Sequence, residues 1–261
     1  MKKLTIIKVG GAVVEDELQL AQLIEDFSNI EGKKVLVHGG GRRATKVAAS
    51  LGIETQMVNG RRITDSKMLE VVTMVYGGLV NKNLVARLQA KGINALGLTG
   101  ADANILHAHK RPLCMVDGSA VDFGFVGDVD GANGAAIAGF IDSGIVPVIA
   151  PLTHDGEGNL LNTNADTIAS ETAKALAPFF DVTLIYCFEK NGVLSNANDD
   201  GSVIPVITRD DFTRYVADGT VAGGMIPKIE NALAAVDAGV SRVIITKATA
   251  IDGEHGTVVR S

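Results

Sequence analysis

Two short apolar runs, each leading directly into a cluster of glycines, constrain the fold of this chain more than any other feature. Leu4–Val9 leads into Gly10-Gly11, and Val35–His38 leads into Gly39-Gly40-Gly41. Apolar runs of this length with β-branched residues predict buried strands. Glycines let backbone N–H groups approach an anion closely, and the start of a following helix favours the same charge. Two such units predict a phosphate cradle built from adjacent loops, with Lys8 near the end of the first strand supplying a positive charge.

Strand-like and helix-like segments alternate along the rest of the chain, which favours a mostly parallel sheet covered by helices on both faces. Apolar spacing predicts a helix between the two glycine units, ending before Gly32. Thr64-Asp65-Ser66 begins a long helical region that bends near Gly77-Gly78, and the Gly- and Asp-rich stretch 117–130 predicts a hairpin and a loop. A soft boundary falls near Leu176–Val182. Further strands are expected at 94–98, 105–109, 145–150, 182–187, 242–246 and 257–260, and further helices at 133–142, 164–176, from 208 and at 227–239.

Composition argues against several classes of function. The 261 residues are 46% hydrophobic, enough for a full core, and the formal net charge is −6. An acidic chain with no Trp and 4% aromatic residues argues against a nucleic-acid partner. No apolar run is long enough to cross a membrane, and Met1-Lys2-Lys3 is not followed by a signal-peptide pattern. Cys114 and Cys187 lie far apart without a CxxC motif, so we expect reduced thiols in a cytoplasmic protein.

Two further motifs carry polar residues for which a structural and a functional interpretation both stand. The arginine pair Arg61-Arg62, within Asn59–Thr64, suits a bidentate contact with a carboxylate, but a charged, solvated turn also explains it. In Asn162–Asp166, Asn164 is a good helix cap. Asp166 then falls in the first helical turn, where the helix dipole also favours an acid.

A third motif points more directly to an anion. Lys228 follows Gly223-Gly224 and Pro227 at an expected helix start, an unfavourable position for a cation unless an anion is bound there. No Walker A or GxSxG pattern occurs, and the histidines lack metal-ligand spacing; His38 is expected to be a hydrogen-bonded core residue. Gly39–Ala44 fits GxGxxA, the dinucleotide fingerprint, but the acidic residue that should follow the next strand is not evident.

Taken in order, KxGG, HGGG, NGxRxT, N-x-NAD and GGMxxK resemble the motifs of the amino acid kinase family over essentially the whole chain. NGxRxT is the motif that favours the branch acting on N-acetylglutamate. The resemblance implies one domain over 1–261, an α/β three-layer αβα sandwich with a mainly parallel open sheet of about eight strands. It implies that residues 1–176 bind the acylated amino acid and carry the contact of a homodimer, while residues 177–261 bind ATP. The implied reaction phosphorylates the side-chain carboxylate of N-acetyl-L-glutamate in arginine biosynthesis.

The same resemblance implies a role for each motif residue. Lys8 and Lys228 would neutralise the transferring phosphoryl group, and Asp166 would orient both lysines. Arg62 and Asn162 would hold the substrate α-carboxylate, and Gly40 and Gly41 would also bind the substrate. The protein itself would hold no metal, because Mg²⁺ would be carried by the nucleotide. A carboxylate is already a nucleophile, so positioning and charge neutralisation suffice without a general base. The residues implied to surround the phosphoryl group through their backbones are Gly10, Gly11, Gly39, Gly40 and Gly41.

The chain departs from the family pattern at two places. Ile185–Gly192 reads IYCFEKNG where relatives usually carry an acidic LTDVxG stretch, so the adenine and ribose contacts are left open. Met57-Val58 stands where relatives often have a basic residue, which leaves open a larger acyl group such as succinyl. The extra N-terminal helix of arginine-inhibited relatives does not precede the first strand, so we expect no arginine feedback. The alternatives are a kinase for another amino acid, a Rossmann-like dinucleotide enzyme and a sensor without turnover.

Overall fold

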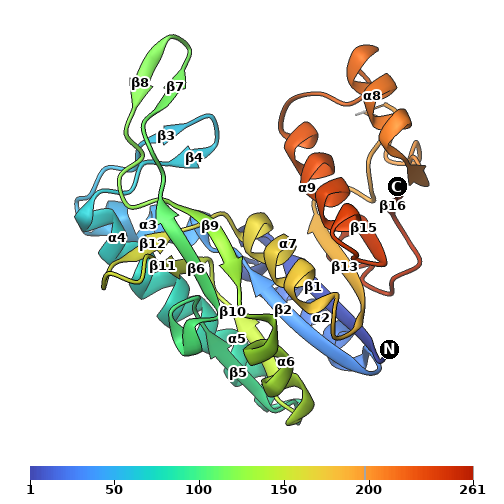
Figure 1. Ribbon diagram of the computed structural model, residues 1–261, viewed down its shortest axis with the longest axis horizontal. Helices are drawn as coiled ribbons and strands as arrows, with labels where there is room; N and C mark the ends of the chain where they lie inside the picture. The colour runs from blue at the N-terminus through green and yellow to red at the C-terminus, as the bar shows by residue number, and fades with distance from the viewer. Residues whose placement is uncertain (197, 261) are drawn as a thin grey trace.

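A single eight-stranded sheet runs through the whole molecule (Figure 1). The computed structural model describes residues 1–196 and 198–260. From edge to edge the strands are β14 (Val206–Ile207), β16 (Thr257–Val259), β15 (Arg242–Lys247), β13 (Asp181–Phe188), β1 (Lys3–Val9), β2 (Lys33–His38), β10 (Val146–Ile149) and β5 (Ala95–Leu98). All neighbouring strands are parallel except β15 and β16, which are antiparallel.

Helices cover both faces of this sheet because alternate residues of its strands point to opposite sides. Ile6 packs in one apolar core and its neighbour Ile7 in the other. The first core is closed by α6 (Gly134–Asp142), α7 (Ala165–Leu176) and α9 (Ile226–Asp237). The second is closed by α2 (Glu17–Asn29), α3 (Gly41–Ser50), α4 (Ser66–Val72) and α5 (Asn81–Gln89). The three-layer αβα sandwich and the mainly parallel sheet of eight strands are therefore confirmed.

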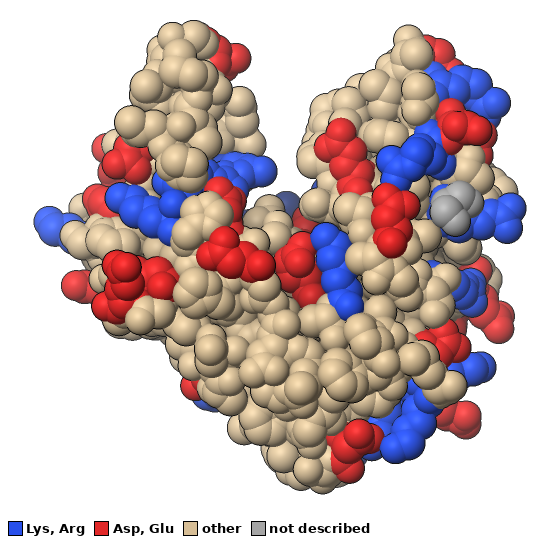
Figure 2. All heavy atoms as spheres, in the orientation of Figure 1, with Lys and Arg blue, Asp and Glu red and all other residues tan. Residues whose placement is uncertain are grey.

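Smaller elements rise above the carboxyl ends of the central strands (Figure 1). They form a four-stranded sheet and two hairpins, which together make an arm of the molecule. Figure 2 shows a deep hollow between this arm and the C-terminal part of the chain. The four-stranded sheet consists of β12 (Leu160–Asn162), β11 (Leu152–His154), β6 (Leu106–Lys110) and β9 (Gly127–Ala132). The hairpins are β3 (Met57–Val58) with β4 (Arg61–Arg62), and β7 (Cys114–Val116) with β8 (Ser119–Val121). The remaining helices of the chain are α1 (Gly11–Glu15), η2 (Asp102–Asn104), η3 (Gly223–Met225) and α8 (Arg209–Ala217), which lies near the C-terminus.

The structure gives more detail for three of the expected segments. The long helical region is divided by η1 (Thr73–Val80), a π-helical segment that contains Gly77-Gly78, where the bend was expected. Asn59 and Gly60 both have positive φ, as in the tight turn of a two-residue hairpin, so β3 and β4 replace the simple charged turn. Within 117–130 the structure has the expected hairpin, but β9 begins where only a loop was expected. Among the described residues, no helix combines the length and apolar character needed to cross a membrane.

Candidate active site

The two glycine loops lie against each other at the carboxyl ends of β1 and β2. The Gly39 N–H donates to the Val9 carbonyl over 2.9 Å. A Cβ built on Gly39 would lie 3.0 Å from the Gly11 nitrogen, and one on Gly11 would lie 3.3 Å from the nitrogens of Gly40 and Gly41. Side chains would therefore separate the loops, whereas glycines let three backbone nitrogens converge. Such a concave group of N–H donors suits an anion.

His38 holds the second glycine loop through a hydrogen bond to its backbone. Its ring is fully buried, with Nδ1 2.8 Å from the Gly39 carbonyl and Nε2 3.1 Å from the side-chain nitrogen of Asn81. Asn81 also donates to the Val148 carbonyl, so its amide nitrogen faces His38 and Nε2 must accept. Burial lowers the pKa of His38 to about 4. The imidazole is thus neutral near pH 7, with its Nδ1–H donating to the loop, as expected for a hydrogen-bonded core histidine.

Lys8 and Asp166 form a nearly buried ion pair beside the glycine loops. Lys8 Nζ lies 2.5 Å from Asp166 Oδ1, and the side chains are only 9% and 16% exposed. Asp166 is held in the first turn of α7, because the Asn164 side chain caps this helix and accepts from the Asp166 N–H. Tyr186, the partner of Lys8 on β13, donates its hydroxyl to the Asp166 carbonyl over 3.2 Å.

Lys228 extends from α9 toward the Lys8–Asp166 pair, but its ammonium lies over an aromatic ring and not beside a carboxylate. Its Nζ lies 3.6 Å from the centre of the Phe188 ring. In the part of the chain that the structure describes, no carboxylate oxygen lies within 4.0 Å of Lys228 Nζ, whereas Asp166 pairs with Lys8. Burial lowers the pKa of Lys228, and the nearby Lys8 ammonium adds to this effect while Asp166 opposes it. An anion arriving between the two lysines would relieve the cost of both charges.

A cavity of about 230 Å³ opens on the other side of the second glycine loop. Arg62 is 8% exposed and donates from Nη2 to the Gly41 carbonyl and the Thr45 hydroxyl, each over 2.9 Å. Asn162 donates to the Thr64 hydroxyl over 3.0 Å. A Cβ on Gly40 would lie 2.9 Å from the ring of Tyr76, another cavity residue. Of the expected site residues, those lining the cavity are Gly39, Gly40, Gly41, Arg62 and Asn162.

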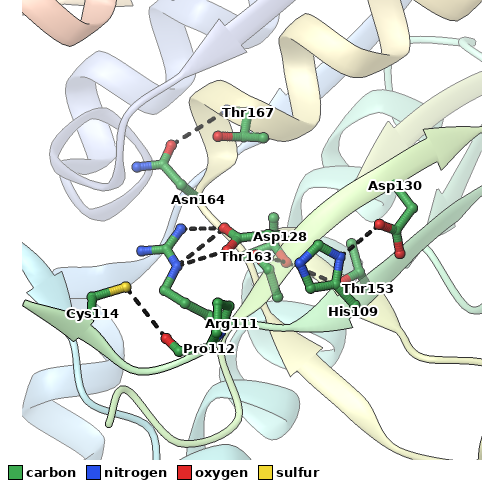
Figure 3. A network of polar contacts seen from close by, with 11 residues as sticks. His109, Arg111, Pro112, Cys114, Asp128, Asp130, Thr153, Thr163, Asn164 and Thr167 are labelled. Atoms are coloured by element: carbon green, nitrogen blue, oxygen red, sulfur yellow. Dashed lines mark hydrogen bonds and ion pairs between the residues drawn. The ribbon is translucent and has the colours of Figure 1, made fainter. Parts of the chain in front are cut away.

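The cavity also contains residues that the sequence motifs do not indicate. Arg111 and Asp128 face each other there (Figure 3), with Arg111 Nε 3.1 Å from both carboxylate oxygens. The Arg111 side chain is 12% exposed. The two residues are 17 positions apart on β9 and the segment after β6, and no short motif joins them. Only the antiparallel pairing of β6 with β9 brings them together.

Converging backbone N–H groups and two lysines beside a small polar cavity, on an αβα sandwich, are features that phosphoryl transfer requires. The family model described as amino acid kinase family matches residues 3–247, and the chain belongs to this family. It is 65% identical over 259 residues to the acetylglutamate kinase of Phocaeicola vulgatus, and 64% identical to that of Bacteroides thetaiotaomicron, covering 99% of both chains in each case. Among solved structures, the N-acetylglutamate synthase of Neisseria gonorrhoeae matches with a TM-score of 0.80 at 22% identity, over 100% of this chain and 59% of that one, which supports the fold.

Proposed function

We propose that this chain is an ATP-dependent kinase that phosphorylates the side-chain carboxylate of N-acetyl-L-glutamate in arginine biosynthesis. The observation that carries the proposal is its similarity, over 99% of both chains, to proteins named acetylglutamate kinase. The site described above supplies what the reaction needs. A carboxylate oxygen forms a bond to the γ-phosphorus of ATP while the bond from that phosphorus to the bridging oxygen breaks. The products are an acyl phosphate and ADP, and no proton has to move.

Charge neutralisation is the main task that this reaction leaves to the protein. We assign it to Lys8 from β1 and Lys228 from α9, and to the N–H groups of the glycine loops. Asp166 holds the Lys8 ammonium through their ion pair. Mg²⁺ enters with the nucleotide, as part of the substrate, and adds positive charge to its phosphates. The nucleotide lies over residues 177–261, and the acyl amino acid lies within residues 1–176.

The cavity beside the second glycine loop is proposed to hold the acyl amino acid. Arg62 offers a guanidinium and Asn162 an amide near this loop, both suited to an α-carboxylate. Because Arg62 also bonds the Gly41 carbonyl, the substrate contact and the phosphate loop are joined by a single side chain.

Arg111 favours a second candidate substrate. Its guanidinium lines the same cavity and pairs there with the Asp128 carboxylate, so an acyl group that ends in a carboxylate would compete with Asp128 for it. An N-succinyl group ends in a carboxylate, which an arginine binds well. N-succinylglutamate is therefore the alternative that the cavity supports.

Hydroxylamine tests both candidates, because it traps acyl phosphates as hydroxamates. Purified protein with Mg-ATP is given N-acetylglutamate, N-succinylglutamate, glutamate or aspartate in parallel. Product with N-acetylglutamate supports the proposal, and a much higher kcat/KM with the succinyl compound selects the alternative. Product only with a free amino acid would reassign the chain to another kinase. Absence of product with all four would contradict turnover and favour a sensor.

We further propose a homodimer that works in the cytoplasm. Strand β5 ends the central sheet, and Met74 and Leu79 on η1 are 53% and 49% exposed, which provides an open strand edge and an apolar surface. Both cysteines are free thiols, consistent with a reducing compartment. Light scattering during gel filtration tests the dimer, and a mass of one chain at micromolar concentration would contradict it.

A further inference from the structure

The Phe188 ring lies at the point where the two lysines meet. Lys228 Nζ is 3.6 Å from the ring centre, and Lys8 Nζ is 5.3 Å from it. Phe188 belongs to Ile185–Gly192, the stretch that departs from the usual acidic pattern of the family. The departure therefore puts an aromatic face beside two ammonium groups.

The position of this ring is fixed by the strand that carries it. Tyr186 and Phe188 are two residues apart on β13 and therefore point to the same face of the sheet. Their rings are stacked, with centroids 6.0 Å apart and planes inclined by 13°. Tyr186 is 1% exposed and bonds the Asp166 carbonyl through its hydroxyl. The ring of Phe188 thus rests on the side chain that also anchors the ion pair of Lys8.

Electrostatics explains why a ring is useful here. Two ammonium groups repel each other, and Asp166 supplies one negative charge, which pairs with Lys8. The charged groups that act on Lys228 are Asp166 from α7, Lys8 from β1 and Glu189 after β13. The face of an aromatic ring carries partial negative charge and attracts a cation within about 6 Å. It holds Lys228 without adding a carboxylate that would repel the phosphates of ATP.

We propose that Phe188 is a positioning residue, which holds the Lys228 ammonium beside Lys8 so that both meet the transferring phosphoryl group. This inference rests on the proposed function, because it assumes that Lys228 acts on that group. Phe188 acts through Lys228 and is not among the residues that line the proposed acyl amino acid cavity. Its loss should therefore lower kcat and leave the KM for the acyl amino acid unchanged.

The test compares variants of Phe188 in the hydroxamate reaction. Phe188→Leu and Phe188→Met remove the aromatic face, and kcat should fall by about 3- to 30-fold, the range of a cation–π contact. Phe188→Tyr keeps the face and should stay within about 3-fold of the original kcat. Phe179→Leu is the matched control, because that ring is 45% exposed and should be replaceable without effect. Thermal melting of each variant identifies any that fails to fold, and the conclusion is drawn from those that fold.

A double-mutant cycle separates positioning from a general structural role. In the background of Lys228→Met, Phe188→Leu should cause no further loss of kcat. The same 3- to 30-fold loss in both backgrounds would overturn the proposal, as would an unchanged kcat in Phe188→Leu and Phe188→Met. A loss confined to the KM for ATP would assign Phe188 to nucleotide binding and would also overturn it. Failure of the unaltered protein to form any hydroxamate would instead refute the proposed function itself.

Discussion

Acidification is expected to destabilise this protein through one residue, His38. The ring is fully buried beneath the second glycine loop, and burial lowers its pKa from 6.5 to about 4. In the unfolded chain the same imidazole binds a proton near pH 6.5. Between these two values the unfolded state holds more protons than the folded state. The free energy of unfolding therefore rises with pH from 4 to 6.5 and falls as the pH is lowered through this window.

The size of the effect follows from the two pKa values. A difference of one pKa unit corresponds to about 1.4 kcal/mol, so the shift at His38 is worth roughly 3 kcal/mol. This contribution is fully present above pH 6.5 and is lost by about pH 4. The greatest slope that one group can give is about 1.4 kcal/mol per pH unit. A loss of 3 kcal/mol is a large part of the 5–15 kcal/mol typical of a folded domain.

Urea unfolding at several pH values between 4 and 8 measures this contribution. Carboxylates also titrate at the acidic end, so the informative quantity is the difference between the unaltered protein and His38→Asn. The variant loses stability at pH 7 but should show a shallower decline between pH 6.5 and 4.5. His255→Asn removes a side chain that is 74% exposed and serves as the control. Parallel stability curves for the unaltered protein and His38→Asn would refute the reasoning.

Three further predictions concern the site and the packing of its helices. Lys8→Ala should lower kcat in the hydroxamate assay by about 10²- to 10³-fold, the scale for losing one transition-state donor, and a near-full rate would count against its assigned role. Asp166→Asn keeps the shape of the carboxylate but not its charge, so turnover should fall and the melting temperature should drop, because Lys8 then keeps a nearly buried charge without its partner, while circular dichroism should show that the fold is retained. A Cβ on Gly134 would lie 2.0 Å from the Ala175 carbonyl, so Gly134→Ala must separate α6 from α7 and should cost about 1–3 kcal/mol in urea unfolding. Gly139→Ala on the same helix is the control for Gly134→Ala, because its Cβ meets nothing within 4 Å and the change should be neutral or stabilising by up to about 1 kcal/mol.

Features encoded by neighbouring residues could be predicted from the sequence. Thr208 and Asp211 form the expected capping box of α8, and Asn133 and Asn164 cap α6 and α7. Pro227 lies in the first turn of α9, as expected. These signals depend on local interactions within three or four residues, so the spacing of the residues in the sequence is enough to predict how each helix begins.

Features that depend on distant strands could not be predicted in this way. Strand β9 is rich in Gly and Asp, which have low strand propensity, and it exists because it pairs with β6. The same pairing brings Arg111 to Asp128, so this part of the cavity carries no sequence motif. The contact between Lys228 and Phe188 likewise joins α9 to β13. Asp166, which was expected to orient both lysines, forms an ion pair with Lys8, whereas the Lys228 ammonium lies over the Phe188 ring.

The position of β1 in the sheet leaves one edge of this strand unpaired while the chain is being synthesised. It pairs with β2 early in the sequence, but its other edge is covered by β13, which ends at Phe188. At 5–20 residues per second, translation from the end of β2 to the end of β13 takes roughly 8 to 30 s. During this interval the central strand has a free edge seven residues long, able to pair with another nascent chain. A chain that ends near residue 180 would therefore keep this free edge, even though all the residues that line the cavity beside the second glycine loop precede it.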